Sequence, residues 1–346
     1  MKLFVTGGAG FIGSNFIRYI LQRRSEYSVV NYDKLTYAGN LANLEPVSEH
    51  ANYHFVKGDI CDPESVELAM RGCEAIVHFA AESHVDRSIY EPAPAIQTNV
   101  TGTLVLLQTA RKLGVRRFVH ISTDEVYGDI PPNHSSDENS PLRPSSPYSA
   151  SKAGADLLVL SYVRTYGFPA LITRSSNNYG PYQFPEKFLP LMITNALQNK
   201  NLPLYGDGRQ ERDWLHVEDH CRGVASVLEQ GRVGEIYNIG GDECHENVAV
   251  ARELLRLMGK DEILISFVQD RPGHDRRYAL NSTKIRTELK WKPEIPLKEG
   301  LRRTIDWYDK NEKWVEAVRG GEYRSYYEKY YENRKSSLEA VTRPAS

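Results

Sequence analysis

A glycine-rich turn lies near the start of the chain, between a short apolar stretch and a helical pattern. Gly7, Gly10 and Gly13 mark this turn, and Asp33 follows Gly13 by 20 residues, at the end of the next apolar stretch. Glycines at this spacing allow a tight turn, a close approach of the backbone to a pyrophosphate, and close packing of the helix on the strand. The acid at this distance suits a ribose hydroxyl. Together these features predict a β-α-β unit that binds a dinucleotide.

Short apolar runs alternate with helical patterns through the first half of the chain. We predict strands at 3–5, 28–32, 53–56, 75–79, 117–121, 170–173 and 235–239, and helices at 14–25, 64–72, 95–113, 150–167, 186–199 and 217–230. This alternation predicts an α/β fold with a doubly wound parallel sheet of the Rossmann type, covered on both faces by helices. After about residue 245 the pattern is mixed, with one more strand expected at 263–268. It predicts a smaller mixed α/β C-terminal substrate lobe.

The pattern breaks between 175 and 213, which predicts two domains that are each built from two segments. The nucleotide-binding domain is expected to comprise 1–174 plus 214–245, and the substrate domain 175–213 plus 246–333. The last residues, 334–346, lack apolar periodicity, so we expect them to form a disordered tail.

Composition excludes several classes of protein. A net charge of −2 leaves no basic surface for nucleic acid, and no apolar run approaches the roughly 20 residues of a membrane span. The predicted strand that begins next to Met1 leaves no room for a signal peptide. The four cysteines show no metal-binding spacing. We therefore expect a cytoplasmic protein with reduced thiols and no metal, nucleic-acid or membrane partner.

Two further segments predict an acid–base site. Tyr148 and Lys152 lie four residues apart at the start of a predicted helix, so they share one face. A nearby ammonium lowers the pKa of a phenol, which makes a proton acceptor for a sugar or alcohol hydroxyl. Thr123, Asp124 and Glu125 end the fifth predicted strand, whose carboxyl end faces the same cleft. Two adjacent carboxyls divide acid and base roles if their surroundings differ, although both residues also suit a simple cap.

Three histidines lie in or just after predicted strands. His78 and His120 are inside strands, where we expect them to pack in the core rather than bind a ligand. His84 follows a strand end, a position that suits either packing or contact with a substrate.

Taken together, these segments resemble the extended short-chain dehydrogenase/reductase family and, within it, the dTDP-glucose 4,6-dehydratases. The resemblance runs from Met1 to about residue 310, and the stretches that carry it most specifically are 33–41, 81–88, 122–128, 177–182, 212–214 and 271–275. The Thr123-Asp124-Glu125 triplet discriminates this group. The related nucleotide-sugar 4-epimerases share the glycine turn and the Tyr-x-x-x-Lys pattern but usually carry small hydroxyl residues at the triplet.

The resemblance implies a hydro-lyase that retains NAD and converts dTDP-D-glucose to dTDP-4-keto-6-deoxy-D-glucose, on the way to deoxysugars such as rhamnose. C4 is oxidised, water leaves across C5 and C6, and C6 is reduced. Tyr148, assisted by Lys152 and Thr123, would take the proton of the 4-hydroxyl. Glu125 would remove the C5 proton, and Asp124 would protonate the departing C6 hydroxyl. The alternative is another NAD-dependent nucleotide-sugar dehydratase, 4-epimerase or decarboxylase.

The resemblance also implies a set of contacts for each ligand. Those implied for NAD are Gly7, Gly10, Phe11, Ile12, Gly13, Asp33, Lys34, Leu35, Thr36, Gly39, Asp59, Ile60, Ala80, Ala81, Thr98, Tyr148 and Lys152. Those implied for the nucleotide-sugar are Ser83, His84, Thr123, Asn177, Glu186, Lys187, Phe188, Pro203, Tyr205, Arg212, Asn247, Arg271 and His274. Among these, Arg212 and Arg271 suit the pyrophosphate as planar guanidinium forks. A C-terminal tyrosine is implied as well, with Tyr323, Tyr326, Tyr327, Tyr330 and Tyr331 as the candidates.

The predicted helices at 95–113 and 150–167 are apolar on more than one face. A second buried face predicts either a partner or extra covering by the second lobe. The resemblance implies a homodimer that pairs these two helices into a four-helix interface.

Overall fold

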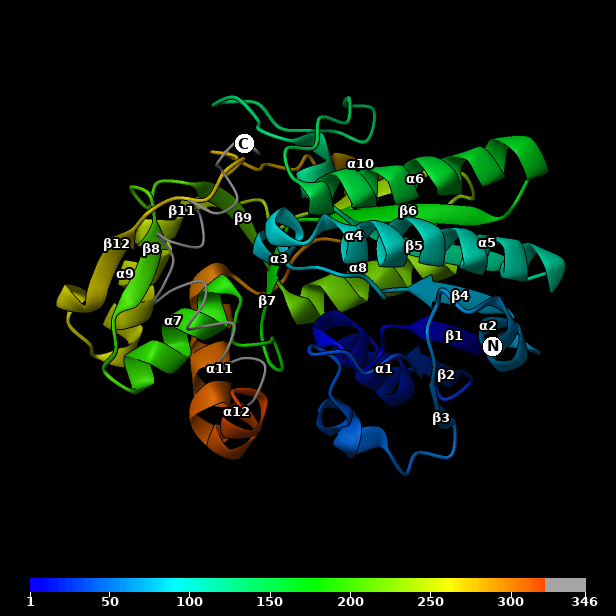
Figure 1. Ribbon diagram of the computed structural model, residues 1–346, viewed down its shortest axis with the longest axis horizontal. Coiled ribbons are helices and arrows are strands. Elements are labelled where there is room, and N and C mark those ends of the chain that lie inside the picture. The colour runs from blue at the N-terminus through cyan, green and yellow to red at the C-terminus, as the bar shows by residue number, and fades with distance from the viewer. Residues whose placement is uncertain (321–346) are drawn as a thin grey trace, which may run out of the picture.

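The structure is a computed structural model that describes residues 1–320. Its centre is a seven-stranded sheet in the order β10-β6-β5-β4-β1-β2-β3, with every neighbouring pair parallel (Figure 1). The strands are β1 (Lys2–Thr6), β2 (Ser28–Asp33), β3 (Tyr53–Lys57), β4 (Ala75–His78), β5 (Arg117–Thr123), β6 (Ala170–Ser175) and β10 (Ile236–Ile239). The predicted doubly wound sheet is confirmed, strand by strand.

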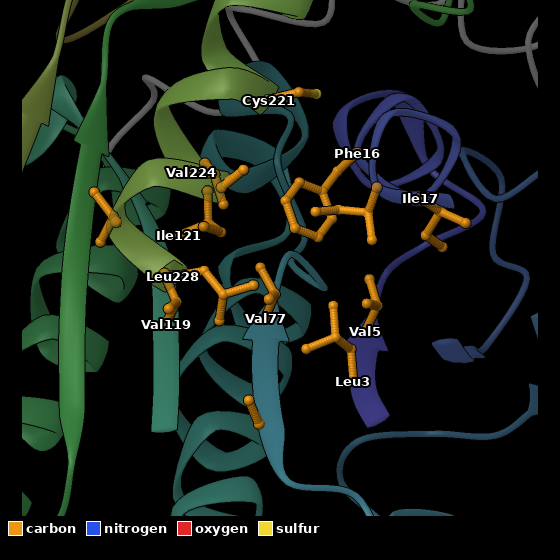
Figure 2. Close-up of a cluster of buried hydrophobic side chains, with 14 of the residues drawn as sticks. Leu3, Val5, Phe16, Ile17, Val77, Val119, Ile121, Cys221, Val224 and Leu228 are labelled. Carbon is orange, nitrogen blue, oxygen red and sulfur yellow. The ribbon is translucent and has the colours of Figure 1, made fainter. Parts of the chain in front are cut away.

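Both faces of this sheet are covered, which is why its central strands are apolar along their length. One face packs against α1 (Phe11–Arg23), α8 (Val217–Gln230) and α10 (Thr283–Leu289), and the other against α2 (Pro63–Met70), α5 (Thr103–Lys112) and α6 (Pro147–Tyr166). Figure 2 shows the first of these cores, in which Phe16 of α1 and Val224 of α8 lie over Val77 of the sheet.

The predicted helix at 95–113 is divided into three pieces. These are α4 (Pro92–Ile96), the π-helical turn η2 (Gln97–Gly102) and α5. In the π-helical turn, the Asn99 side chain bonds both backbone groups of Glu82, at 2.9 Å to the nitrogen and 3.0 Å to the oxygen. A π-helical turn of this kind is frequent at functional sites, and this one carries Thr98 to the edge of a cavity.

Helix α6 begins at a well-defined point, which fixes where Tyr148 lies. Ser146 and Ser149 form a reciprocal capping box, and Pro147 takes the first helical position, where its missing N–H costs nothing. The helix ends at Gly167, which adopts a left-handed φ of 61°.

A smaller mixed lobe follows the sheet, as predicted. Two small sheets build it: β11 (Cys244–Glu246), β9 (Glu211–His216) and β7 (Asn177–Tyr179) form one, and β12 (Ile265–Val268) and β8 (Leu202–Tyr205) the other. Around their apolar core pack α7 (Phe188–Leu197), α9 (Asn247–Met258), α11 (Leu297–Lys310) and α12 (Glu312–Val318). The strand expected at 263–268 starts later, because Glu262–Leu264 forms a 3-10 turn, η4.

Three further short elements follow strands of the central sheet, namely η1 (Leu41–Val47) after β2, α3 (Val85–Tyr90) after β4 and η3 (Asp124–Tyr127) after β5. Within residues 1–320, no helix has the length and apolarity that a bilayer crossing requires. The same residues hold no cluster of three or more His, Cys, Asp or Glu arranged for a metal ion. The predicted tail 334–346 and the five candidate tyrosines lie outside the described residues.

Candidate active site

Two adjoining cavities lie at the carboxyl ends of the central strands. The order of the sheet reverses between β1 and β4, which is the point where α/β sheets place their ligands. A cavity of about 310 Å³ lies there, and a second of about 160 Å³ is lined mainly by the smaller lobe. Four residues line both cavities, namely Glu125, Asn177, Glu186 and Lys187. The two cavities are therefore neighbouring parts of one site.

The glycine turn between β1 and α1 fits a pyrophosphate. Gly7 has a left-handed φ of 69°, and a Cβ there would lie 2.5 Å from the backbone nitrogen of Ala80. A Cβ at Gly13 would lie 2.2 Å from the carbonyl oxygen of Gly7. Helix α1 starts without a side-chain cap, and Phe11, Ile12 and Gly13 of its first turn line the cavity. Such an N-terminus is a ready anion site.

Asp33 lies beside the turn, as the sequence predicts. Its Oδ2 accepts the Ala9 N–H at 2.9 Å and its Oδ1 accepts the Leu35 N–H at 2.8 Å. Burial raises the pKa of this carboxyl, and the two N–H donors oppose the rise. Nearby, the Lys34 ammonium pairs with Asp59 at 2.7 Å. The glycine turn, the uncapped helix and this acid suit NAD.

Of the residues predicted to contact NAD, all but Leu35 line the first cavity. Leu35 is not among the lining residues, and its side chain packs against the apolar core. Only its backbone serves the site, through the N–H bonded to Asp33.

The predicted acid–base residues gather on one wall of the first cavity. Thr123, Asp124 and Glu125 come from the end of β5, and Tyr148 and Lys152 from the first turns of α6. Because β5 is the second neighbour of β1 in the sheet, these residues line the same cavity as the glycine turn.

The Lys152 ammonium is not among the main influences on the Tyr148 pKa. Its Nζ donates to the carbonyl oxygen of Ile121 at 2.7 Å, and burial lowers its pKa to about 8. The pKa of Tyr148 is raised, first by burial and then by the charges of Glu125 and Asp124, while the side-chain hydrogen bond with Thr123 lowers it. The expected lowering of the Tyr148 pKa is therefore wrong for the protein alone, because burial and the two carboxyls raise it.

The two neighbouring carboxyls have different surroundings. Asp124 is 3% exposed, and its Oδ2 has no hydrogen-bond partner. Its pKa is raised well above the usual value by burial and by the charges of Glu125 and Asp213. Burial also raises the pKa of Glu125, but the cations Arg271, Arg212 and Lys187 oppose that rise. Asp124 thus suits the neutral acid and Glu125 the ionised base, the division that the sequence predicts.

Every residue predicted to contact the nucleotide-sugar lines one of the two cavities. The two arginines differ, however. Arg271 keeps a buried Nε without a partner, so it has donor capacity left for a ligand. Arg212 directs its two terminal nitrogens to the backbone carbonyls of Glu211, Arg276 and Asp275 and stacks on Tyr278.

Sequence reasoning missed Asp86, which lines the second cavity and bonds two residues of the smaller lobe there. Its carboxyl accepts the Arg271 guanidinium at 2.9 Å and the Tyr205 hydroxyl at 2.7 Å. Asp86 lies within the stretch 81–88 that carries the resemblance, so that stretch was the available signal. Its partners lie 119 and 185 residues further along the chain, a relation that only the fold reveals.

The predictions for the histidines are also resolved. His78 and His120 are buried in the sheet, as expected, and the two His78 ring nitrogens bond Thr6 and Thr103. His84 has both a structural role and a position at the site. It caps α3 and lines the second cavity.

Comparison with known proteins agrees with this geometry. Residues 4–304 match the family model described as GDP-mannose 4,6 dehydratase. A dTDP-glucose 4,6-dehydratase of Shigella flexneri is 50% identical over 363 residues, which cover 96% of this chain and 100% of that protein. The crystal structure of dTDP-glucose 4,6-dehydratase from Streptomyces venezuelae, with NAD and a second ligand bound, is 52% identical with a TM-score of 0.90. It covers 92% of this chain and 100% of that one.

A related enzyme of another activity is more distant. The structure of a UDP-glucose 4-epimerase from Thermus thermophilus in complex with NAD has a TM-score of 0.84 but is only 31% identical, covering 90% of this chain and 100% of that one. The full-length identity to the dehydratases, together with the two carboxyls at the end of β5, decides between the groups. The chain belongs to the dTDP-glucose 4,6-dehydratase family, within the extended short-chain dehydrogenases/reductases.

Proposed function

We infer that this protein is a dTDP-glucose 4,6-dehydratase, which converts dTDP-D-glucose to dTDP-4-keto-6-deoxy-D-glucose and water. The observation that carries the inference is the pair Asp124 and Glu125, adjacent in the chain but in different surroundings, on the same cavity wall as Tyr148. An epimerase has no use for two such carboxyls, because it neither removes the C5 proton nor expels the C6 hydroxyl.

The first cavity holds the cofactor through the glycine turn, Asp33 and Thr98. NAD held there would supply the hydride acceptor for the oxidation of C4 and the hydride donor for the reduction of C6. The protein's own groups move the protons. Tyr148 takes the proton of the 4-hydroxyl, with Thr123 as its hydrogen-bond partner.

Elimination follows from the chemistry of the 4-ketone. Hydroxide is a poor leaving group, but a carbonyl at C4 acidifies the C5 proton and stabilises the charge that its removal creates. Glu125, whose negative charge Arg271, Arg212 and Lys187 stabilise against burial, removes this proton. Asp124, kept neutral by burial and by neighbouring carboxyls, protonates the oxygen that leaves C6.

The second cavity holds the nucleotide and its diphosphate. Arg271 offers its free Nε to a phosphate oxygen while Asp86 fixes the opposite edge of the guanidinium. The division of labour follows the predicted domains. We propose that 1–174 plus 214–245 bind NAD, and that 175–213 plus 246–333 select the nucleotide-sugar.

Product analysis in heavy water tests the function. The purified protein is incubated with dTDP-glucose, and with UDP-glucose in parallel, and the masses of the products are measured by mass spectrometry. A dehydratase yields a product that has lost one water and gained one deuterium, since the C5 position exchanges with solvent before C6 is reduced. A product of unchanged mass that proves to be the 4-epimer would contradict the dehydratase and favour the epimerase. The faster substrate identifies the base.

The reaction rate should fall on both sides of neutrality. Lys152, with its pKa lowered to about 8, loses its charge as the pH rises through that value, so steps that need the ammonium slow down. Glu125 acts as a base only above its raised pKa, so the rate falls as acid protonates it. Profiles of kcat/KM between pH 5 and 10 measure both limbs. In Lys152→Arg, whose cation does not titrate, the alkaline limb should disappear. An unchanged limb would assign it to another group.

We also propose a homodimer that forms through α5 and α6. Leu157 of α6 is 58% exposed and Ile96, just before η2, is 45% exposed, although both are large and apolar. Leu157→Asp should convert a dimer into a monomer at micromolar concentration in sedimentation velocity. Leu68→Asp, on exposed α2, provides the matched control and should leave the dimer intact. A wild-type protein that sediments only as a monomer would overturn the proposal.

We place the enzyme in the cytoplasm. All four cysteines are free, as expected where thiols stay reduced.

A further inference from the structure

The peptide unit of Ala9, in the middle of the glycine turn, is fixed at both ends. Its N–H donates to Asp33 at 2.9 Å. Its carbonyl oxygen accepts two hydrogen bonds, one from the Asn43 side chain at 2.9 Å and one from the Asn40 N–H at 3.0 Å. Helix α1, whose uncapped first turn lines the first cavity, begins two residues later. The direction of the N–H groups of that turn therefore depends on how firmly Ala9 is held.

Asn43 connects this turn to the far end of the described chain. It is 1% exposed and lies in η1. While its amide nitrogen holds Ala9, its Oδ1 accepts the indole N–H of Trp314 at 2.9 Å. Trp314 belongs to α12 of the smaller lobe, 271 residues after Asn43. One amide side chain thus bridges the cofactor turn and the last described helix.

Trp314 is itself held in an aromatic cluster. Its ring lies 5.1 Å from that of Trp307, 6.4 Å from that of Tyr308 and 6.0 Å from that of Tyr182, measured between centroids. The Arg18 guanidinium of α1 lies 3.8 Å over the Tyr182 ring and also donates to the Asn43 carbonyl at 3.0 Å. The smaller lobe therefore contacts both α1 and η1 through this cluster.

The backbone conformation of Tyr182 indicates that the aromatic cluster is held in one arrangement. Tyr182 adopts a φ of 68°, the left-handed region that a residue with a side chain rarely enters. Such a conformation persists only where surrounding contacts impose it. Here the contacts are the Trp307 ring at 4.5 Å and the Arg18 cation.

We propose that Trp314 is a positioning residue for the cofactor: through Asn43 it fixes the Ala9 carbonyl, and so slows the release of the dinucleotide. This inference rests on the proposed function, since it assumes that NAD occupies the first cavity. If the indole N–H is lost, the buried Asn43 oxygen has no donor, and the amide is free to turn away from Ala9. The residue touches neither the sugar nor the reacting atoms, so its effect should appear in cofactor retention.

The experiment compares two conservative variants. Trp314→Phe removes the donor to Asn43 but keeps an aromatic ring in the cluster. Trp307→Phe is the matched control, because it removes an indole from the same cluster and leaves the Asn43 bond in place. Each protein is loaded with NADH, and the loss of bound NADH fluorescence is followed by stopped flow after mixing with excess NAD. Thermal unfolding is measured alongside.

Release from Trp314→Phe should be about three- to tenfold faster than from wild type, the effect of one lost hydrogen bond. Release from Trp307→Phe should stay within about twofold of wild type, even if both variants unfold at similarly lowered temperatures. Equal release rates for the two variants would overturn the proposal, since general loosening of the cluster would then account for the change.

The route through Asn43 is tested by a double variant. If Trp314 acts through Asn43, then Asn43→Ala and the double variant Asn43→Ala/Trp314→Phe should release NADH at the same rate. A further acceleration in the double variant would contradict this route. A wild-type protein that binds no NADH would contradict the proposed function itself, an outcome distinct from equal rates in the two tryptophan variants.

Discussion

Replacing Tyr148 by phenylalanine is expected to lower kcat by about 10²- to 10⁴-fold, the range that a positioned acid–base group contributes. The phenol is buried and lines the same cavity wall as Thr123 and Glu125, so no water takes its place readily. KM for the nucleotide-sugar should change little, because the contacts that we propose for the nucleotide lie in the second cavity. Steady-state kinetics of the purified variant measure both constants.

Tyr53→Phe is a suitable control for this loss. The Tyr53 hydroxyl also accepts a hydrogen bond, from Asn31 at 3.0 Å, but the residue lines neither cavity. Its kcat should stay within about twofold of the native value. A Tyr148→Phe enzyme that keeps more than a tenth of the native kcat would show that another group takes the proton of the 4-hydroxyl.

The two neighbouring carboxyls should fail in different ways when each is made an amide. Asp124→Asn has no proton to give to the departing oxygen, so dehydration should slow by about 10²- to 10⁴-fold while C4 oxidation and C5 exchange continue. Glu125→Gln has no base for the C5 proton, so it should lose dehydration and C5 exchange together. Both amides keep the shape of the side chain.

Deuterium at C5 of the recovered substrate separates these outcomes. Substrate recovered after incubation in heavy water should carry deuterium with Asp124→Asn and none with Glu125→Gln. The opposite labelling would exchange the roles of the two residues. Product formation at the native rate by Asp124→Asn would remove the acid role from Asp124 altogether.

The sequence predicts most of the central sheet because its strands are apolar on both faces. Such runs stand out against the polar segments between them, and the residues that follow them, such as Thr123, are placed at the carboxyl edge by the topology alone. The strands of the smaller lobe are harder to predict from the sequence. Its strands Asn177–Tyr179 and Cys244–Glu246 have three residues each and no alternating pattern, so only their pairing with β9 makes them strands.

The electrostatics of the site could not be predicted from the sequence for a related reason. The spacing of Tyr148 and Lys152 shows that they share a helix face, but the pKa of the phenol depends on burial and on what else faces it. Burial and the carboxyls of Asp124 and Glu125 decide its direction, and these depend on how β5 meets α6. Likewise, no local pattern pairs Asp86 with Arg271 across 185 residues.

The wall that the two cavities share has a thermodynamic consequence. Four residues line both cavities, namely Glu125, Asn177, Glu186 and Lys187. A ligand that orders these side chains from one cavity therefore alters the free energy with which a ligand binds in the other. Linkage makes this coupling reciprocal: whatever factor the dinucleotide contributes to affinity for the sugar nucleotide, the sugar nucleotide contributes to affinity for the dinucleotide. If the coupling is favourable, the enzyme binds its cofactor most tightly during turnover. Dissociation of the reduced cofactor at that stage would leave the sugar oxidised at C4 with no hydride donor for C6.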